Sequence, residues 1–248
     1  MRHQRRLLPI DIQRTEPAPF NSADCTHYGI GFDRLPYILK SPKHDSPYLP
    51  AAELLSCRLA SDAQIACATG EIAKLPDGQL VFASKAESSI PSPADTAAAL
   101  LTDLTLLNTV SATIAAVYAF DVFVTNEDRH LGNYLLRRTF AGADLMAVDH
   151  SRALLVTGWP WKNLRLNACN TTRCQAALRN VSPFLMHHAL DAIGRISSLD
   201  DDWLERNSSD IPESWWPLDS RKSVDRWWRV SRKRRLARLR RGLENGTL

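Results

Sequence analysis

The stretch that decides the fold is a polar run between two apolar segments: N-E-D-R-H-L-G-N, residues 126–133. Loops held by a rigid scaffold are where catalytic side chains tend to lie. Within this run, Asp128 and Asn133 are five positions apart, and sixteen residues after Asn133 the carboxylate of Asp149 ends the apolar stretch L-M-A-V-D. These three residues are the first candidates for a functional site.

Their spacing matches a site for phosphoryl transfer. The kinase pattern H-R-D-x-x-x-x-N places a catalytic aspartate five residues before a metal-binding asparagine. Phosphoryl transfer requires positioning and neutralisation of the triphosphate charge more than covalent chemistry. Mg²⁺ prefers oxygen ligands, which Asn133 and Asp149 would supply, while Asp128 would orient the acceptor hydroxyl and take its proton. The predicted cofactors are therefore ATP and Mg²⁺.

The longer stretch F-D-V-F-V-T-N-E-D-R-H-L-G-N, residues 120–133, resembles the catalytic loop of HipA-type serine/threonine kinases. Its D-R-H-x-x-N part also resembles the phosphoinositide lipid kinases. V-D-H-S, residues 148–151, resembles their altered form of the metal-binding triad, which reads D-F-G in protein kinases. The resemblance implies transfer to a Ser or Thr hydroxyl of a protein, and a toxin–antitoxin setting with a cognate inhibitor as partner.

The resemblance also covers the segment before residue 87. Y-I-L-K, residues 37–40, resembles the strand with the nucleotide-binding lysine, which makes Lys40 the expected phosphate contact and Lys43 its rival. Glu53, in A-A-E-L-L, would be the helix partner of Lys40. The alternative for Glu53 is a first-turn acid that complements the helix dipole.

Two further nucleotide contacts follow from the same resemblance. L-V-F-A-S-K-A, residues 80–86, would run into the hinge that accepts the adenine, with Ala83 and Lys85 as contacts. The loop over the phosphates would be F-N-S-A-D-C-T, residues 20–26, with Ser22 beside them. This loop contains no glycine, whereas kinases usually cover the phosphates with a glycine-rich loop.

The order of predicted elements indicates two unlike lobes. A chain of 248 residues is long enough for one substantial domain or two lobes that share a cleft. We expect an α+β, bilobal, protein-kinase-like fold, with a β-rich N-terminal lobe over residues 1–86 and a helical C-terminal lobe over 87–248. The predicted elements are a hairpin over 28–40, a helix over 50–60, a hairpin around P-D-G at 76–78, a linker over 87–93, helices over 94–107 and 111–122, and short strands over 134–138 and 144–148.

Composition excludes several classes of protein. Hydrophobic residues make up 44% and charged residues 23%, which is ordinary for a globular chain. The most apolar stretch, residues 114–124, is interrupted by Asp121 and is too short to span a membrane. Five scattered cysteines and the lack of a secretory h-region favour a reducing, cytoplasmic location. Cys169 and Cys174 are spaced like half a zinc site, but reduced thiols are the preferred interpretation.

The C-terminal segment carries an excess of positive charge. Residues 221–248 hold eleven Lys or Arg against Asp225 and Glu244, a net +9, which leaves −5 for the rest of the chain. The pattern indicates an amphipathic basic helix that docks by its apolar stripe, with contact to nucleic acid or an anionic membrane as the rival interpretation. Two alternatives to a protein kinase stay open. One is a lipid or small-molecule kinase, because D-R-H-x-x-N is shared with such enzymes, and the other is a catalytically degenerate scaffold or nucleic-acid binder that uses this basic helix, which the glycine-free phosphate loop favours.

Overall fold

The computed structural model describes residues 8–17, 27–86, 92–140, 142–165 and 168–248. Its first part contains a closed five-stranded barrel with the strand order β1-β2-β3-β5-β4. Neighbouring strands are antiparallel except β1 and β4, whose parallel pairing at Ile10 and Asp11 closes the barrel. The strands are β1 (Ile10–Pro17), β2 (His27–Gly31), β3 (Pro36–Lys40), β4 (Gly70–Lys74) and β5 (Leu80–Lys85).

Alternating apolar side chains fill the barrel, as period-2 patterning requires. Both predicted hairpins are present, and the second turns at P-D-G. There Gly78 has a φ of +88°, and the side chain of Asp77 accepts a hydrogen bond from the Gln79 amide at 2.9 Å. The interior of the barrel is a separate small core made of Ile10, Ile12, Tyr37, Leu39, Ala73, Val81 and Ala83.

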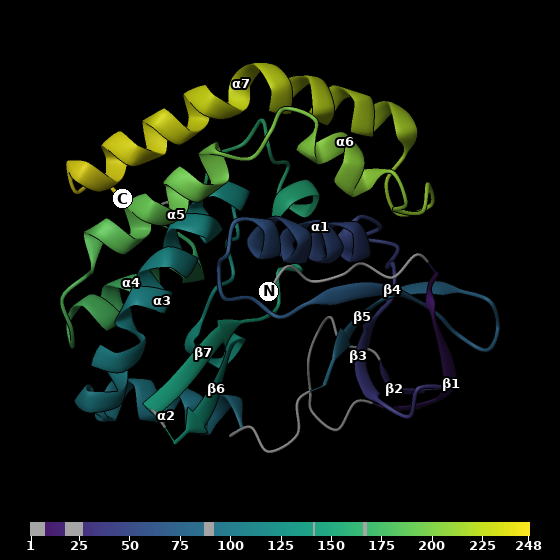
Figure 1. The fold of residues 1–248 in the computed structure, drawn as a ribbon, viewed down its shortest axis with the longest axis horizontal. Coiled ribbons are helices and arrows are strands. Elements are labelled where there is room, and N and C mark those ends of the chain that lie inside the picture. The colour runs from purple at the N-terminus through teal and green to yellow at the C-terminus, as the bar shows by residue number, and fades with distance from the viewer. Residues whose placement is uncertain (1–7, 18–26, 87–91, 141, 166–167) are drawn as a thin grey trace.

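Helix α1 (Leu49–Asp62) lies between the barrel and the helical part of the molecule (Figure 1). Pro50 occupies its first turn, where a missing N–H is tolerated. Residues 49–60 are all buried, because β4 and β5 pack on one side of the helix and later elements of the chain pack on the other. This placement carries Glu53 to the junction of the two lobes.

The second part of the chain is mainly helical, with one two-stranded sheet. The sheet is the antiparallel hairpin of β6 (Tyr134–Thr139) and β7 (Gly142–Ala147). The helices are α2 (Pro93–Thr102), α3 (Leu104–Val124), α4 (Asn170–Arg179), α5 (Met186–Ser197), α6 (Trp203–Ser208) and α7 (Leu218–Glu244), with single 3₁₀ turns at Leu131–Asn133 and Leu154–Val156.

The boundary between α2 and α3 differs from the prediction. The sequence predicts helices over 94–107 and 111–122, but the break falls at Asp103, and α3 continues through residues 108–110. Asp103 is extended, and its side chain accepts a hydrogen bond from the Leu106 amide at 2.9 Å. The N-cap of α3 therefore sets this boundary. Of the predicted linker, residues 87–91 lie outside the described residues, and Pro93 already belongs to α2.

Helix α3 is longer and more apolar than the sequence analysis expected. Its 21 residues are long and apolar enough to cross a membrane by length and composition, a test that buried core helices also pass. In this molecule 72% of its most apolar 18-residue window is buried inside the fold. It forms the centre of the larger core, against α5, α7 and β7.

Helix α7 runs along the outside of the helical part, over α5 and α6 (Figure 1). Its buried stripe includes Val224, Trp228 and Leu236, so the predicted docking by an apolar face is confirmed. The indole N–H of Trp228 donates to the carbonyl of Asp200 at 3.1 Å. The architecture is the predicted α+β arrangement of a β-barrel lobe followed by a helical lobe.

Candidate active site

Three residues from distant parts of the chain meet at the junction of the lobes. Lys40 is the last residue of β3, Glu53 lies in α1, and Asp149 follows β7. The ammonium of Lys40 contacts Glu53 Oε1 and lies 2.8 Å from Asp149 Oδ1. Lys40 is 6% exposed and Glu53 2%. The structure therefore pairs Glu53 with Lys40, and the rival Lys43 lies instead in a short bridge with Ser46.

The charged groups of this cluster shift one another's pKa values. Burial alone would lower the pKa of Lys40, but attraction by Glu53 and Asp149 outweighs burial and raises this pKa above its ordinary value. Burial would raise the pKa of Asp149, but Lys40 and the hydrogen bonds from Ser151 hold it well below its usual range. Burial raises the pKa of Glu53 against the attraction of Lys40. The cluster thus holds a protonated amine beside an ionised Asp149.

The backbone at Asp149 is held in an uncommon conformation. Its φ is +61°, in the left-handed region that non-glycine residues seldom adopt. The hydroxyl of Ser151 donates to Asp149 Oδ1 at 2.6 Å, and the amide of His150 donates to Glu53 Oε2 at 3.1 Å. Oδ1 is thus shared by Lys40 and Ser151, whereas no hydrogen bond from the described residues reaches Oδ2.

The loop at 126–133 brings Asp128 and Asn133 together. The amide nitrogen of Asn133 donates to the backbone carbonyl of Asp128 at 3.0 Å, which leaves the amide oxygen of Asn133 available to a ligand. The carbonyl of Asn133 accepts a hydrogen bond from the Val148 amide at 3.0 Å, which ties the loop to the residue before Asp149. Asn133 is 7% exposed, and Asp128 is half-buried.

A buried ion pair between Arg129 and Asp121 fixes the loop at 126–133. Arg129 is 2% exposed, and its guanidinium donates to both carboxylate oxygens of Asp121, at 2.8 and 3.0 Å. It also donates to the carbonyls of Asn133 and Val148. Bidentate pairs of this kind combine charge with fixed geometry. Arg129 therefore holds residues 133 and 148 at a set separation.

The imidazole of His150 completes the buried layer. Burial lowers the pKa of His150 well below its ordinary value, and the charge of Arg129 lowers it further, so the ring is neutral. Its Nε2 lies 3.0 Å from Arg129 Nη2 and therefore accepts a hydrogen bond from the guanidinium. His130, by contrast, is exposed and lies beside Gly132 and Pro93.

The first turn of α4 contacts the loop from the other side. The side-chain amide of Asn170 donates to Asp128 Oδ1 at 2.6 Å, and its backbone amide donates to the carbonyl of Glu127 at 2.9 Å. The hydroxyl of Thr171 donates to the carbonyl of Asn126 and accepts from the amide of Arg129. One carboxylate oxygen of Asp128 is thus fixed by α4, and no hydrogen bond from the described residues reaches its Oδ2.

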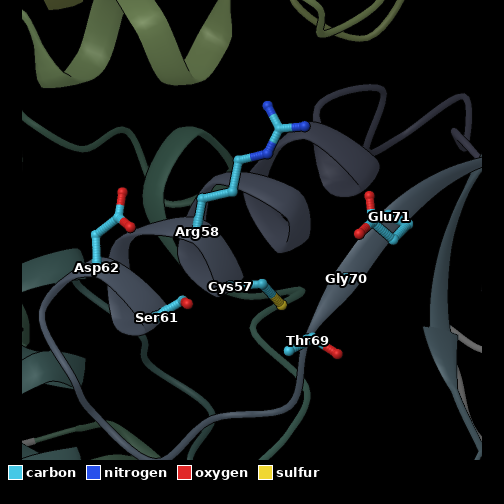
Figure 2. Close-up of a pocket in the computed structure, with 7 residues that line it drawn as sticks. All are labelled: Cys57, Arg58, Ser61, Asp62, Thr69, Gly70 and Glu71. Atoms are coloured by element: carbon cyan, nitrogen blue, oxygen red, sulfur yellow. The ribbon is translucent and has the colours of Figure 1, made fainter. Parts of the chain in front are cut away.

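The remaining predicted contacts do not join this cluster. Ala83 and Lys85 lie on β5, where Ala83 belongs to the barrel core and Lys85 is exposed, so their role toward adenine stays a prediction. Ser22 lies outside the described residues. Figure 2 shows a hollow between α1 and β4, lined by residues that include Cys57 and Arg58. None of the predicted site residues lines it. Its volume of about 20 Å³ holds little more than one water molecule.

Comparisons with known proteins bear on the fold. No family model and no curated protein matches the sequence. The structure is similar to that of the proinflammatory kinase CtkA of Helicobacter pylori, with a TM-score of 0.62 and 14% identity, over 96% of this chain and 99% of CtkA. The chain has a kinase-like fold.

A second solved structure gives the same result. It is that of the toxin–antitoxin system HipA, HipB and its operator DNA from Shewanella oneidensis MR-1. The TM-score is 0.53 at 11% identity, over 96% of this chain and 68% of the other. At such identities the likeness establishes the fold alone. Membership of the HipA-type family, which the sequence resemblance predicts, stays a prediction.

Sequence reasoning missed several residues that hold this candidate site together. Asp121 interrupts the most apolar stretch of the chain, and a carboxylate there requires a buried partner. That signal was present, and the partner is Arg129. Asn170 and Thr171 gave no such signal, because they reach the loop from 42 to 45 positions along the chain.

Proposed function

We propose that this protein is an ATP-dependent phosphotransferase assisted by Mg²⁺, acting as a HipA-like serine/threonine protein kinase. One observation carries the proposal: buried Lys40 contacts both Glu53, 13 positions along the chain, and Asp149, 109 positions along the chain. Burial of an ammonium is costly unless opposite charges and hydrogen bonds compensate it. Two carboxylates around one amine hold it in a fixed position where it can meet the oxygens of a triphosphate.

The donors present fit Mg²⁺. Asp149 Oδ2 and the amide oxygen of Asn133 are hard oxygen atoms without a hydrogen bond from the described residues. Among the described residues, no group of three or more His, Cys, Asp or Glu could hold a metal ion, so Mg²⁺ at this site would rest on these two oxygens together with ligands from outside the protein. This suits Mg²⁺, which usually keeps several waters and phosphate oxygens. When bound, the ion neutralises phosphate charge that develops during transfer.

The residues of this chain then have separate tasks. Lys40 donates hydrogen bonds to phosphate oxygens, and Glu53 keeps its ammonium in place. Asp128 accepts the proton of the acceptor hydroxyl at Oδ2 while Asn170 holds Oδ1. The freed oxygen forms a bond to the γ-phosphorus, the bond from that phosphorus to the ADP oxygen breaks, and ADP leaves with the electron pair.

The acceptor that we propose is a Ser or Thr hydroxyl of a protein. Support comes from the loop motif at 126–133 and from the fold shared with CtkA, which is described as a kinase, and with HipA. The likeness to HipA also supports a search for a cognate inhibitor. A panel of protein, lipid and small-molecule acceptors separates the proposed class from the other kinase classes with this loop.

The test begins with calorimetric titration of ATP into the protein, with Mg²⁺ and with EDTA. We expect binding that depends on Mg²⁺ and is lost in Asp149→Ala, while Asp144→Ala, which removes an exposed carboxylate on β7, binds as the wild type does. Lys40→Met should weaken binding, and Lys43→Met should not. Transfer of labelled phosphate to a protein acceptor is then measured. The proposal fails if ATP does not bind under either condition.

A further inference from the structure

The cations of helix α7 differ in whether they have carboxylate or carbonyl partners. In the first half, Arg229 pairs with Asp202 and Glu205, both at 2.6 Å. Arg232 is buried and donates to the carbonyls of Leu199 and Asp200. Carboxylates and carbonyls of residues 199–205 therefore compensate these two cations.

Six other exposed cations of α7 lack such partners among the described residues. Six exposed cations have no carboxylate within ion-pair distance among the residues that the structure describes, and together we call them the cationic face. The cationic face consists of Arg226, Lys233, Arg234, Arg238, Arg240 and Arg241.

These six side chains share one side of the helix. Arg226, Lys233 and Arg240 follow one another at intervals of seven residues, close to two helical turns, and Arg234 and Arg241 repeat that interval. Residues at this spacing project in nearly the same direction, and the face extends for about 22 Å along the axis. The opposite side of α7 is the buried stripe.

The helix dipole does not account for this cluster. Cations near a helix C-terminus are favourable, but the effect is confined to the last turn. Lys233, Arg234 and Arg238 lie before that turn. Like charges four residues apart, such as Arg234 and Arg238, repel each other within a helix. The fold pairs Arg229 and buries Arg232 and Arg235, but it leaves the six cations of the cationic face without carboxylate partners among the described residues, so they are available for an external anion.

A groove beside the face offers room for such an anion. It lies between α5 and α7 and has a volume of about 450 Å³. Lys233 and Arg240 line it together with the hydroxyl residues Ser197 and Ser198 of the end of α5. A Cβ added at Gly194, another lining residue, would meet no atom within 4 Å, so the groove is open at that point. Arginine and hydroxyl groups are common phosphate contacts.

The chemistry of the face distinguishes among anionic partners. A membrane surface is held by apolar and aromatic side chains inserted beside the cations, and single strands are held by stacking on aromatic rings. Helix α7 directs its aromatic side chains inward, where Trp227 packs against Trp159 and Trp228 is 1% exposed. Val230 is its one large apolar side chain exposed toward this side. What remains is contact with a regular array of phosphates.

We propose that the cationic face of α7 binds the phosphate backbone of duplex nucleic acid without reading its sequence. The face contains none of Lys40, Glu53, Asp128, Asn133 or Asp149, so this binding is independent of phosphoryl transfer. Asp128→Asn should bind duplex as the wild type does.

The test is fluorescence anisotropy with a labelled 25-base-pair duplex of arbitrary sequence in 50–300 mM NaCl. If all six cations meet phosphates, the logarithm of the binding constant falls with the logarithm of salt concentration with a slope of about −5. The variant Lys233→Gln, Arg234→Gln, Arg240→Gln should reduce the slope to about −2 to −3 and weaken binding about 10²-fold at 0.1 M salt.

A matched control removes the same charge elsewhere. Arg137→Gln, Arg138→Gln, Lys222→Gln replaces three exposed cations outside the cationic face and should change the affinity less than threefold. An equal loss in both triple variants would mean that only net charge matters and would overturn the proposal. Salt-insensitive binding, tighter binding to a single-stranded 25-mer, or binding to phosphatidylserine vesicles but not to the duplex would overturn it as well.

Discussion

The junction of the two lobes and the cationic face of α7 are both dense in charge, and they differ in how that charge is compensated. At the junction, Lys40 is buried between Glu53 and Asp149, and Arg129 is buried against Asp121. On α7, six exposed cations have no acidic partner among the described residues. Matched buried charges fix a geometry, whereas unmatched exposed charges attract a ligand without fixing one. Substitutions in the two regions should therefore differ in kind as well as in size.

The largest effect is expected where a carboxylate takes part in the chemistry. Asp128→Asn keeps the shape of the side chain and its contact with Asn170 but removes the basic oxygen. Turnover should fall about 10²–10⁴-fold while the affinity for ATP changes little. Steady-state kinetics with parallel calorimetry checks this, with Asp144→Asn as the control. Unchanged turnover in Asp128→Asn would remove Asp128 from the role of base.

The next effect concerns stability and compares a buried with an exposed ion pair. Asp121→Ala leaves the guanidinium of Arg129 buried without its carboxylate partner, which should lower the free energy of unfolding by about 3–5 kcal/mol. Asp144→Ala breaks the exposed pair with Arg137 and should lower it by about 0–1 kcal/mol. Urea denaturation measures both. Equal losses would show that burial of the Asp121–Arg129 pair does not increase its contribution to the free energy of unfolding.

A smaller effect is expected where a neutral side chain positions the base. Asn170→Ala removes the hydrogen bond to Asp128 Oδ1, and the loss of about 1–1.5 kcal/mol corresponds to roughly a tenfold fall in kcat. KM for ATP should stay the same, because Asn170 contacts Asp128 rather than the Lys40 cluster. Asn180→Ala, at the far end of α4, is the control and should leave kcat unchanged. A change confined to KM would contradict the positioning role.

The smallest effect on stability is expected at the exposed cations of α7, in contrast to a buried cation of the same helix. Lys233→Gln, Arg234→Gln, Arg240→Gln should change the free energy of unfolding by less than about 0.5 kcal/mol, because these exposed side chains have no hydrogen bond or ion pair with other described residues. Arg235→Gln, one residue from Arg234, should destabilise by about 1–3 kcal/mol, since buried Arg235 donates to the carbonyls of Pro160 and Lys162. Thermal and urea denaturation distinguish the two. A large loss in the triple variant would place these cations among the structural ones.

Much of the fold follows from local signals in the sequence. P-D-G fixes a hairpin because Gly78 adopts the positive φ that this turn needs, and the amphipathic pattern of α7 gives its docked side correctly. The order of Asp128, Asn133 and Asp149 indicates phosphoryl transfer, because the spacing within a catalytic loop can be read directly from the sequence and compared with the kinase pattern. The boundary at Asp103 was missed, since a cap competes with continuous helical periodicity and only the folded backbone shows which prevails.

The rest of the site depends on contacts that the sequence does not encode locally. The sequence alone did not decide whether Glu53 pairs with Lys40 or complements the helix dipole. The position of α1 beside Lys40 and His150 decides it. Asn170 became relevant only through the fold, because α4 reaches the loop from 42 positions away. Such contacts arise from tertiary packing, which overrides what a short window of residues specifies.

Closure of the barrel restricts how an extended peptide could be recognised. Each of the five strands of the small lobe already has two neighbours, since β1 and β4 pair with each other. Peptide capture by strand addition requires a sheet edge with unpaired backbone groups. Among the described strands, β6 and β7 form a two-stranded sheet, and the outer side of β7 is already paired at Ala147 by a bridge to Cys67. A peptide added to this hairpin as an extra strand would therefore join β6, which begins directly after Asn133.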